Sequence, residues 1–135
     1  MTDRHHRSID IWLADIVRWG ERLASHLEGM TFDQFVSDQK AQDAAAKCAE
    51  AIGEAAGQIL KVEPDFDSMH PGLQLRLAFR SRNRLSHGYF SIDLGLLWNT
   101  VTVSIPRTVN SAKVLLATGL PFANKTDGGG DAAGA

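Results

Sequence analysis

Apolar side chains recur at three- and four-residue spacing over most of the chain, a pattern that predicts amphipathic helices. The first helix is expected to run from an N-cap at Ser8 to Gly29, and a short turn capped by Thr31 should follow. An alanine-rich helix is expected over residues 38–60. Its predicted buried stripe consists of Ala41, Ala45, Cys48, Ile52, Ala55 and Ile59.

Two glycines interrupt the interior of that alanine-rich helix, at Gly53 and Gly57. Glycine weakens a helix interior by about 1 kcal/mol relative to alanine. Because neither position reads as a turn, we expect a neighbouring helix to approach the backbone closely at these two residues.

The second half of the chain predicts two or three further helices. Residues 61–72 carry two prolines and should form a loop, and a helix over residues 73–86 should end or bend at Gly88. The apolar contacts of this helix are expected from Leu75, Leu77, Phe79 and Leu85.

Asp93 is a plausible cap for a helix that continues to Ile105, although the alternation of Val101, Val103 and Ile105 also fits a short strand. Such a strand would have no evident partner. Pro106 should lie in the first turn of a final helix that Gly119 ends.

These elements predict an all-α fold, an antiparallel bundle of four to five helices. The 135 residues suffice for a single domain, which is expected to span residues 1–124. The small residues and repeated glycines of residues 125–135 predict a disordered tail.

Charge is distributed unevenly along the chain. The formal net charge is −2, yet no acidic residue lies between Asp67 and Asp93. That interval holds Arg76, Arg80, Arg82 and Arg84. The basic character is therefore local, and it lies on one predicted helix.

Several classes of site are excluded or disfavoured by composition. Cys48 is the only cysteine, so neither an intramolecular disulfide nor a cysteine-based zinc site is expected. The histidines outside the basic segment lack metal-site spacing and are expected to face solvent or to cap helices; they are His5, His6, His26 and His70. We expect no metal, no cofactor and no membrane partner. A polar N-terminus without a hydrophobic segment indicates a cytoplasmic protein.

Residues 82–89, Arg-Asn-Arg-Leu-Ser-His-Gly-Tyr, concentrate the candidate chemistry. Arg82 is permanently charged and can hold phosphate oxygens, whereas His87 can gain or lose a proton near neutral pH. On a helix Arg82 shares a stripe with Ser86 and Tyr89, and Asn83 lies one turn before His87, where it could orient the imidazole. The alternative is an ordinary solvated helix face.

This octapeptide resembles the signature of the HEPN superfamily, and specifically of HepT-like toxins from HepT–MntA modules. Similarity extends over about residues 8–120 and includes Ile52-Gly53-Glu54-Ala55, His70-Pro71 and the segment from Ile92 to Trp98. Leu75 departs from the family, which often has tryptophan there, and we interpret this as a change in core packing.

The resemblance implies a metal-independent endoribonuclease that works as a homodimer. Arg82, Asn83 and His87 would form the catalytic group, with attack by the ribose 2′-hydroxyl on the adjacent phosphate. Arg76, Arg80 and Arg84 would bind the RNA. Ser86 is a possible supporting residue, and Glu54 is another if it pairs with an arginine of the motif helix.

The resemblance also implies a regulator. Tyr89 would receive AMP from a partner, an MntA-like minimal nucleotidyltransferase antitoxin. Two alternatives remain at this point: a non-catalytic HEPN module that binds nucleotide or a partner nucleotidyltransferase, and a purely structural helical dimer. Trp12, Trp19 and Trp98 are expected to anchor the core or the dimer interface rather than to stack on bases.

Overall fold

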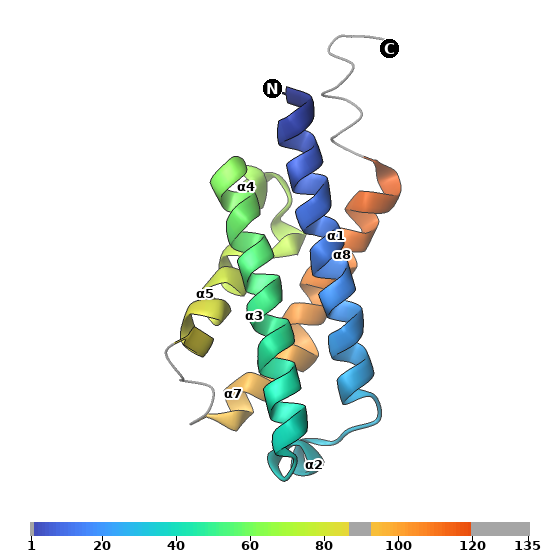
Figure 1. The fold of residues 1–135 in the computed structure, drawn as a ribbon, viewed down its shortest axis with the longest axis vertical. Helices are drawn as coiled ribbons and strands as arrows, with labels where there is room; N and C mark the ends of the chain where they lie inside the picture. Colours follow the sequence, from blue (N-terminus) through green and yellow to red (C-terminus); the bar gives the residue numbers. More distant parts are fainter. Residues whose placement is uncertain (1, 87–92, 120–135) are drawn as a thin grey trace.

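The computed structural model describes residues 2–86 and 93–119, with the backbone alone for residues 2–8 and Ser86, and its regular elements are all helical (Figure 1). This confirms the expected all-α bundle. The helices in chain order are α1 (Thr2–Leu27), α2 (Phe32–Val36), α3 (Gln39–Val62), α4 (Phe66–Met69), α5 (Leu75–Ser86), α7 (Leu94–Asn99) and α8 (Ile105–Thr118).

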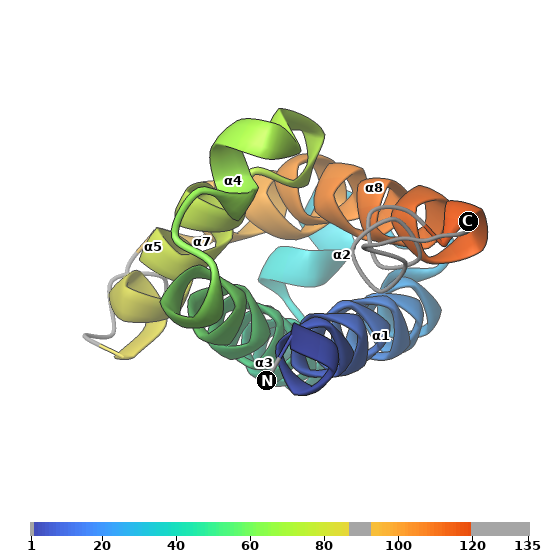
Figure 2. The ribbon, with the colours of Figure 1, turned by 90° about the horizontal axis from the view of Figure 1, so that it is seen from above.

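The four longest helices alternate in direction. In Figure 1, α1 descends from the N-terminus, α3 rises beside it, α5 descends and α8 rises again. Figure 2 shows α1 and α3 together on one side of the bundle, with α5 and α8 across from them. Helix α3 packs against both α1 and α5 along its length, so it links the N-terminal helix to the helix with the arginines.

Capping residues define the beginnings of two helices, and the sequence predicted the cap at Thr31. Thr31 accepts a hydrogen bond from the Gln34 N–H at 3.2 Å, and the Gln34 side chain accepts one from the Thr31 N–H at 2.9 Å, a complete capping box. Asp38 accepts from the Ala41 N–H at 3.0 Å. Ser8, however, caps nothing, because α1 already begins at Thr2. The sequence places Asp3 four residues before Arg7, an order of charges that favours a helix in this segment.

The core is built around α3. All six residues of its predicted apolar stripe are buried, including Cys48. Burial raises the pKa of the Cys48 thiol, although the positive charges of Arg22 and Lys47 act in the opposite direction. The remaining large core side chains come from α1, α2, the α4–α5 region and the C-terminal helices, and include Leu13, Ile16, Phe35, Phe66, Leu73, Leu75, Val101 and Ile105. Helix α5, which carries the arginines, therefore packs on an ordinary apolar core.

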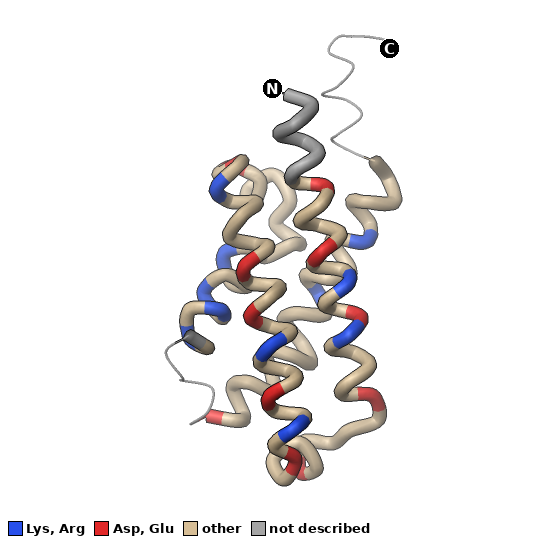
Figure 3. Tube along the Cα trace, in the orientation of Figure 1, with Lys and Arg blue, Asp and Glu red and all other residues tan. Residues whose placement is uncertain are grey.

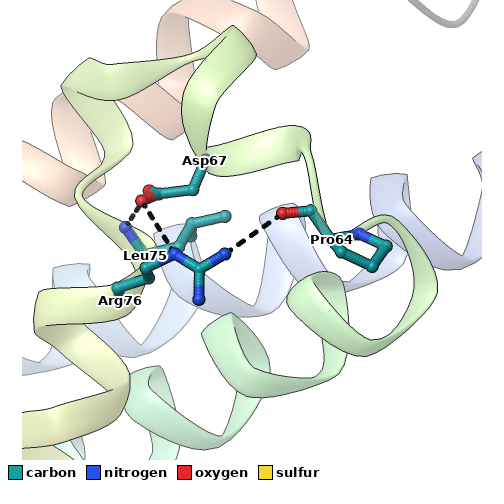
Figure 4. A network of polar contacts seen from close by, with 4 residues as sticks. All are labelled: Pro64, Asp67, Leu75 and Arg76. Atoms are coloured by element: carbon teal, nitrogen blue, oxygen red, sulfur yellow. Dashed lines mark hydrogen bonds and ion pairs between the residues drawn. The ribbon is translucent and has the colours of Figure 1, made fainter.

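Residues 61–72 are more ordered than the expected loop. They contain α4 and a 3₁₀ turn over Pro71–Leu73, because Phe66 is an apolar anchor that lies almost completely buried. Asp67 then caps the next helix from a distance: its Oδ1 accepts from the Leu75 N–H at 2.8 Å (Figure 4). Helix α5 accordingly begins at Leu75 rather than at Leu73.

The apolar side of α5 is narrower than predicted. Leu75 is fully buried, as expected for a leucine that packs in the core, and Phe79 and Leu85 are half-buried. Leu77 was expected to make apolar contacts, but 36% of it is exposed, so that prediction was wrong. At 100° per residue Leu77 lies far around the helix from Leu75, which explains the difference.

The C-terminal half of the bundle is continuous. Helix α7 passes into a π-helical turn over Thr100–Ser104 and then into α8, so Val101, Val103 and Ile105 are helical and the strand alternative is wrong. Gly119 ends α8 with a φ of +71°, a backbone conformation that glycine adopts without strain. The predictions for Gly88 and for the tail fall outside the described residues. Among the helices that are described, none is both long and apolar enough to cross a bilayer.

Candidate functional site

Arg82 lies in the last turns of α5, where this helix makes its closest approach to α3. A Cβ placed on Gly53 would overlap the Cβ of Arg82 and would lie 2.7 Å from the carbonyl oxygen of Ala78. At Gly57 a Cβ would lie 2.6 Å from the ring of Phe79. Both glycines therefore face α5, which confirms the close helix approach predicted from the sequence. The backbone at Arg82 rests directly on α3.

The guanidinium of Arg82 forms an ion pair with Glu54, the residue after Gly53. Arg82 Nε lies 3.1 Å from Glu54 Oε1, and Gln58 Nε2 donates to the second oxygen, Oε2, at 3.0 Å. Arg82 Nη1 also donates to Asn83 Oδ1 at 3.4 Å. The pairing considered for Glu54 is thus present, and it fixes the direction of the arginine while 34% of that side chain stays exposed.

The other arginines of α5 form a stripe at four-residue spacing. Arg80 and Arg84 are exposed. Arg76 is also exposed, but its Nε lies 3.7 Å from Asp67 Oδ2 and its Nη2 donates to the Pro64 carbonyl oxygen at 3.4 Å (Figure 4). Figure 3 shows positive residues following one another along α5. Arg76 therefore helps to hold the start of α5, in addition to any role in binding a polyanion.

Three residues of the predicted site have no described side chain. Ser86 is the last residue of α5, and His87 and Tyr89 lie outside the described residues. The described structure thus places the arginine, its carboxylate partner and the adjacent asparagine. The positions of the imidazole and the phenol relative to these groups stay predictions.

Beside Arg82, a cleft of about 380 Å³ opens between α1 and α3. Its lining combines large aromatic, small apolar and charged residues, namely Trp12, Asp15, Trp19, Lys47, Glu50, Ala51, Glu54, Ala55 and Arg82. Sequence reasoning missed this cleft. The signal available was the seven-residue spacing of Trp12 and Trp19, which puts both on one side of α1.

The remaining histidines and tryptophans have mostly structural surroundings. His70 is the C-cap residue of α4, one of the two roles expected for it: its backbone N–H donates to the Phe66 carbonyl oxygen at 2.9 Å, and its ring stacks on Phe66 with centroids 4.6 Å apart. Trp98 packs against Phe35 at 5.0 Å, and all three tryptophans contact the core as expected. Across the described parts of the chain, no three His, Cys, Asp or Glu residues are grouped as a metal site would require.

Comparison with known proteins assigns the family. The family model described as "Ribonuclease HepT-like" matches residues 18–115, which include α3, α5 and the whole octapeptide. The chain belongs to the HepT-like ribonuclease family. The resemblance inferred from the octapeptide is thereby confirmed.

Three similar proteins have names that describe a ribonuclease. A protein of Thermococcus cleftensis named "Probable ribonuclease HepT" is 36% identical over 100 residues, which cover 74% of this chain and 88% of the relative. A "Putative RNase" of Methanocaldococcus jannaschii is 27% identical over 110 residues, covering 82% and 88% of the two chains. Another "Putative RNase", from Caldanaerobacter subterraneus subsp. tengcongensis, is 28% identical over 105 residues, covering 78% and 91%. No solved structure gives a significant match.

Proposed function

We propose that this HepT-like chain is an endoribonuclease that cleaves RNA without a metal ion and acts as the toxin of a toxin–antitoxin module. The observation that carries the proposal is the anchored Arg82. Its backbone rests on Gly53, its Nε is held 3.1 Å from Glu54, and a third of its side chain is exposed to a substrate. An arginine used only for solubility needs no such support.

The chemistry follows from the residues of the octapeptide. A neutral His87 accepts the proton of a ribose 2′-hydroxyl, and the 2′-oxygen attacks the adjacent phosphorus. The bond from phosphorus to the 5′-oxygen breaks, and that oxygen leaves after taking up a proton. The products are a 2′,3′-cyclic phosphate and a 5′-hydroxyl. Arg82 stabilises the charge that develops on the phosphoryl oxygens through its paired N–H donors.

Asn83 and the stripe of arginines support this reaction. Asn83 lies one helical turn before His87 in sequence and would hold the imidazole in its reactive orientation. Arg80 and Arg84 are exposed on the side of α5 away from the anchored Arg82, and with Arg76 they supply positive charge for the RNA backbone. A homodimer would double this surface and bring two octapeptides to one interface.

Regulation would act on Tyr89, two residues after His87. An MntA-like nucleotidyltransferase antitoxin would transfer AMP to the phenol, with release of pyrophosphate from ATP. The added phosphate would neutralise the arginine clamp and its nucleoside would fill the substrate's place.

A nuclease assay in excess EDTA tests the proposal. We expect single-stranded RNA to be cut to products with cyclic phosphate ends, DNA of the same sequence to stay intact, and His87→Ala and Arg82→Ala each to abolish cutting. His26→Ala, which removes an exposed histidine from the last turn of α1, is the matched control and should cut normally. Undiminished cutting by His87→Ala would remove that residue from the mechanism.

A further inference from the structure

The cleft between α1 and α3 has the composition of a ligand site rather than of a packing defect. Ala51 and Ala55 give its α3 wall small side chains, whereas Trp12 and Trp19 place large ring surfaces on the α1 wall. Both tryptophans are only half-buried, although they also pack against the core. Aromatic faces at a polar cleft are the usual platform for a flat, polarisable ring, and RNA bases stack on such side chains.

The charged groups of the cleft are not equivalent. Asp15 is engaged by Arg18 at 2.9 Å, and Glu54 is engaged by Arg82 and Gln58. Glu50, one turn before Glu54 on α3, makes no hydrogen bond or ion pair with any described side chain. It is therefore the carboxylate available to accept hydrogen bonds from a ligand.

Such a carboxylate distinguishes among the four bases of RNA. Guanine alone presents two adjacent donors on its Watson–Crick edge, N1–H and the N2 amino group, which match the two oxygens of a carboxylate. Adenine and cytosine offer one amino group beside a ring acceptor, and uracil offers one N–H between two carbonyl oxygens. The last three arrangements each set an acceptor against the carboxylate, which is unfavourable.

Positive charge lies at both ends of the α3 wall. Lys47 lies at one end and Arg82 lies at the other, beside Glu54. Lys47 and Glu54 are seven residues apart, which corresponds to about 10 Å along a helix. A nucleotide in the cleft would thus have a cation available for the phosphate on each side of its base.

We propose that this cleft binds a guanine base of the RNA strand whose phosphate Arg82 holds. Trp12 stacks on the base, Trp19, whose ring lies under the Arg22 guanidinium at 4.5 Å, borders the cleft one step further along α1, and Glu50 accepts hydrogen bonds from the N1–H and N2 amino groups of the base. The inference rests on the proposed ribonuclease function for its substrate, and it adds to that function a preference for cutting beside guanosine.

Binding without cleavage separates the two proposals. Fluorescein-labelled 2′-O-methyl tetranucleotides, UUGU and UUUU, lack the attacking hydroxyl and cannot be cut, so fluorescence anisotropy reports affinity alone. We expect UUGU to bind about tenfold or more tightly than UUUU, the size of one stacked and paired base. Equal affinities for the parent chain would overturn the guanine site, even if the chain cuts RNA. A clear guanine preference in a chain without nuclease activity would support the site and count against the catalytic proposal.

Two variants with matched controls test the assignment to this cleft. Glu50→Gln should reduce the preference for UUGU to about threefold or less, and Ala51→Leu, which fills the cleft without removing a charge, should abolish it. The controls are Asp43→Asn, an exposed carboxylate two turns earlier on α3, and Ala14→Leu, an exposed alanine on α1; both should keep the full preference.

Light scattering on the same variants tests a competing occupant. If Ala51→Leu changes the mass of the assembly, the cleft is a contact between protein chains and the nucleotide site is overturned. An unchanged mass together with lost preference supports it. If the Ala51 variant does not fold, Glu50→Gln takes its place, because it changes a partly exposed side chain and keeps its size. A lost preference for UUGU at an unchanged mass then supports the nucleotide site.

Discussion

Arg82 Nε on α5 lies 3.1 Å from Glu54 Oε1 on α3, and this ion pair connects the octapeptide to the helix around which the core is built. Gln58 holds the second oxygen of Glu54, so the carboxylate approaches the arginine from a fixed direction. Because 34% of the Arg82 side chain and 47% of the Glu54 side chain are exposed to solvent, the pair contributes little to stability. Its effect should be on the orientation of the guanidinium.

Glu54→Ala should therefore impair catalysis more than folding. We expect kcat to fall by roughly tenfold to a hundredfold because the guanidinium loses its fixed direction, while KM does not rise because a negative charge near the RNA is removed. Glu54→Gln should recover part of the rate. Steady-state cleavage and thermal melting measure both effects. The control Glu21→Ala removes a similar surface pair, with Lys113 on α8, and should leave kcat unchanged. A rise in KM at constant kcat would contradict an orienting role.

Gly53→Ala should destabilise the bundle, although alanine is normally the better helix former. The added methyl would meet the Ala78 carbonyl oxygen at 2.7 Å as well as the Cβ of Arg82, and a backbone oxygen cannot move without shifting α5. A loss of about 1–3 kcal/mol in the free energy of unfolding is expected. Denaturant titration measures it. Gly95→Ala is the control, because its nearest neighbour lies at an ordinary 3.4 Å, and it should be neutral or slightly stabilising.

Stability should decline at alkaline pH through Cys48. Burial raises the pKa of its thiol above the ordinary value of 9.0, so between the two values the folded chain binds more protons than the unfolded chain. The contribution is fully present below about pH 9 and is lost as the pH rises toward the folded-state pKa. Unfolding free energies measured across this range should fall less steeply for Cys48→Ala than for the parent. Parallel slopes would show that the thiol does not contribute.

The chain should be a dimer in solution. Large apolar side chains are exposed on the described surface, including Ile11, Val36, Met69 and Val114, and an interface between copies would cover surface of this kind. Light scattering at micromolar concentration should give twice the mass of one chain. The mass of a single chain under these conditions would contradict the proposal that two octapeptides share one interface.

Modification of Tyr89 should accompany neutralisation by a nucleotidyltransferase antitoxin. After co-expression, mass spectrometry should find one or more AMP groups on the peptide that contains Tyr89, and the modified protein should no longer cut RNA. Tyr89→Phe should stay unmodified and toxic in the same cells. An inhibited protein with an unmodified Tyr89 would indicate simple occlusion by the partner instead.

Local signals in the sequence were sufficient for most of the fold. Thr31 and Asp38 carry the side chains that cap helices, and the stripe from Ala41 to Ile59 repeats with helical spacing, so each could be recognised without knowledge of its neighbours. Gly53 and Gly57 even predicted a tertiary contact, because their cost in a helix requires a compensating close approach.

The errors came from interactions between distant residues. The beginning of α5 depends on Asp67, eight residues before Leu75, and no pattern within α5 indicates that bond. The loop prediction for residues 61–72 weighed Pro64 and Pro71 above the single apolar anchor Phe66. For the candidate site, the cleft beside Arg82 combines side chains of α1 and α3, and their proximity depends on how those helices pack.

The π-helical turn at Thr100–Ser104 has a consequence for insertions and deletions. Leu97, Val101 and Ile105 are buried at a strict four-residue spacing. In an ordinary α-helix, side chains at this spacing move gradually around the helix, whereas in the wider π-helical turn they stay on one side. Removing one residue from this turn would restore α-helical pairing and rotate α7 by about 100° relative to α8. Asp93, the N-cap of α7, is the first described residue after the octapeptide, so such a deletion would also turn the point at which the chain enters α7. One residue in this turn thus sets the rotation of α7 relative to α8.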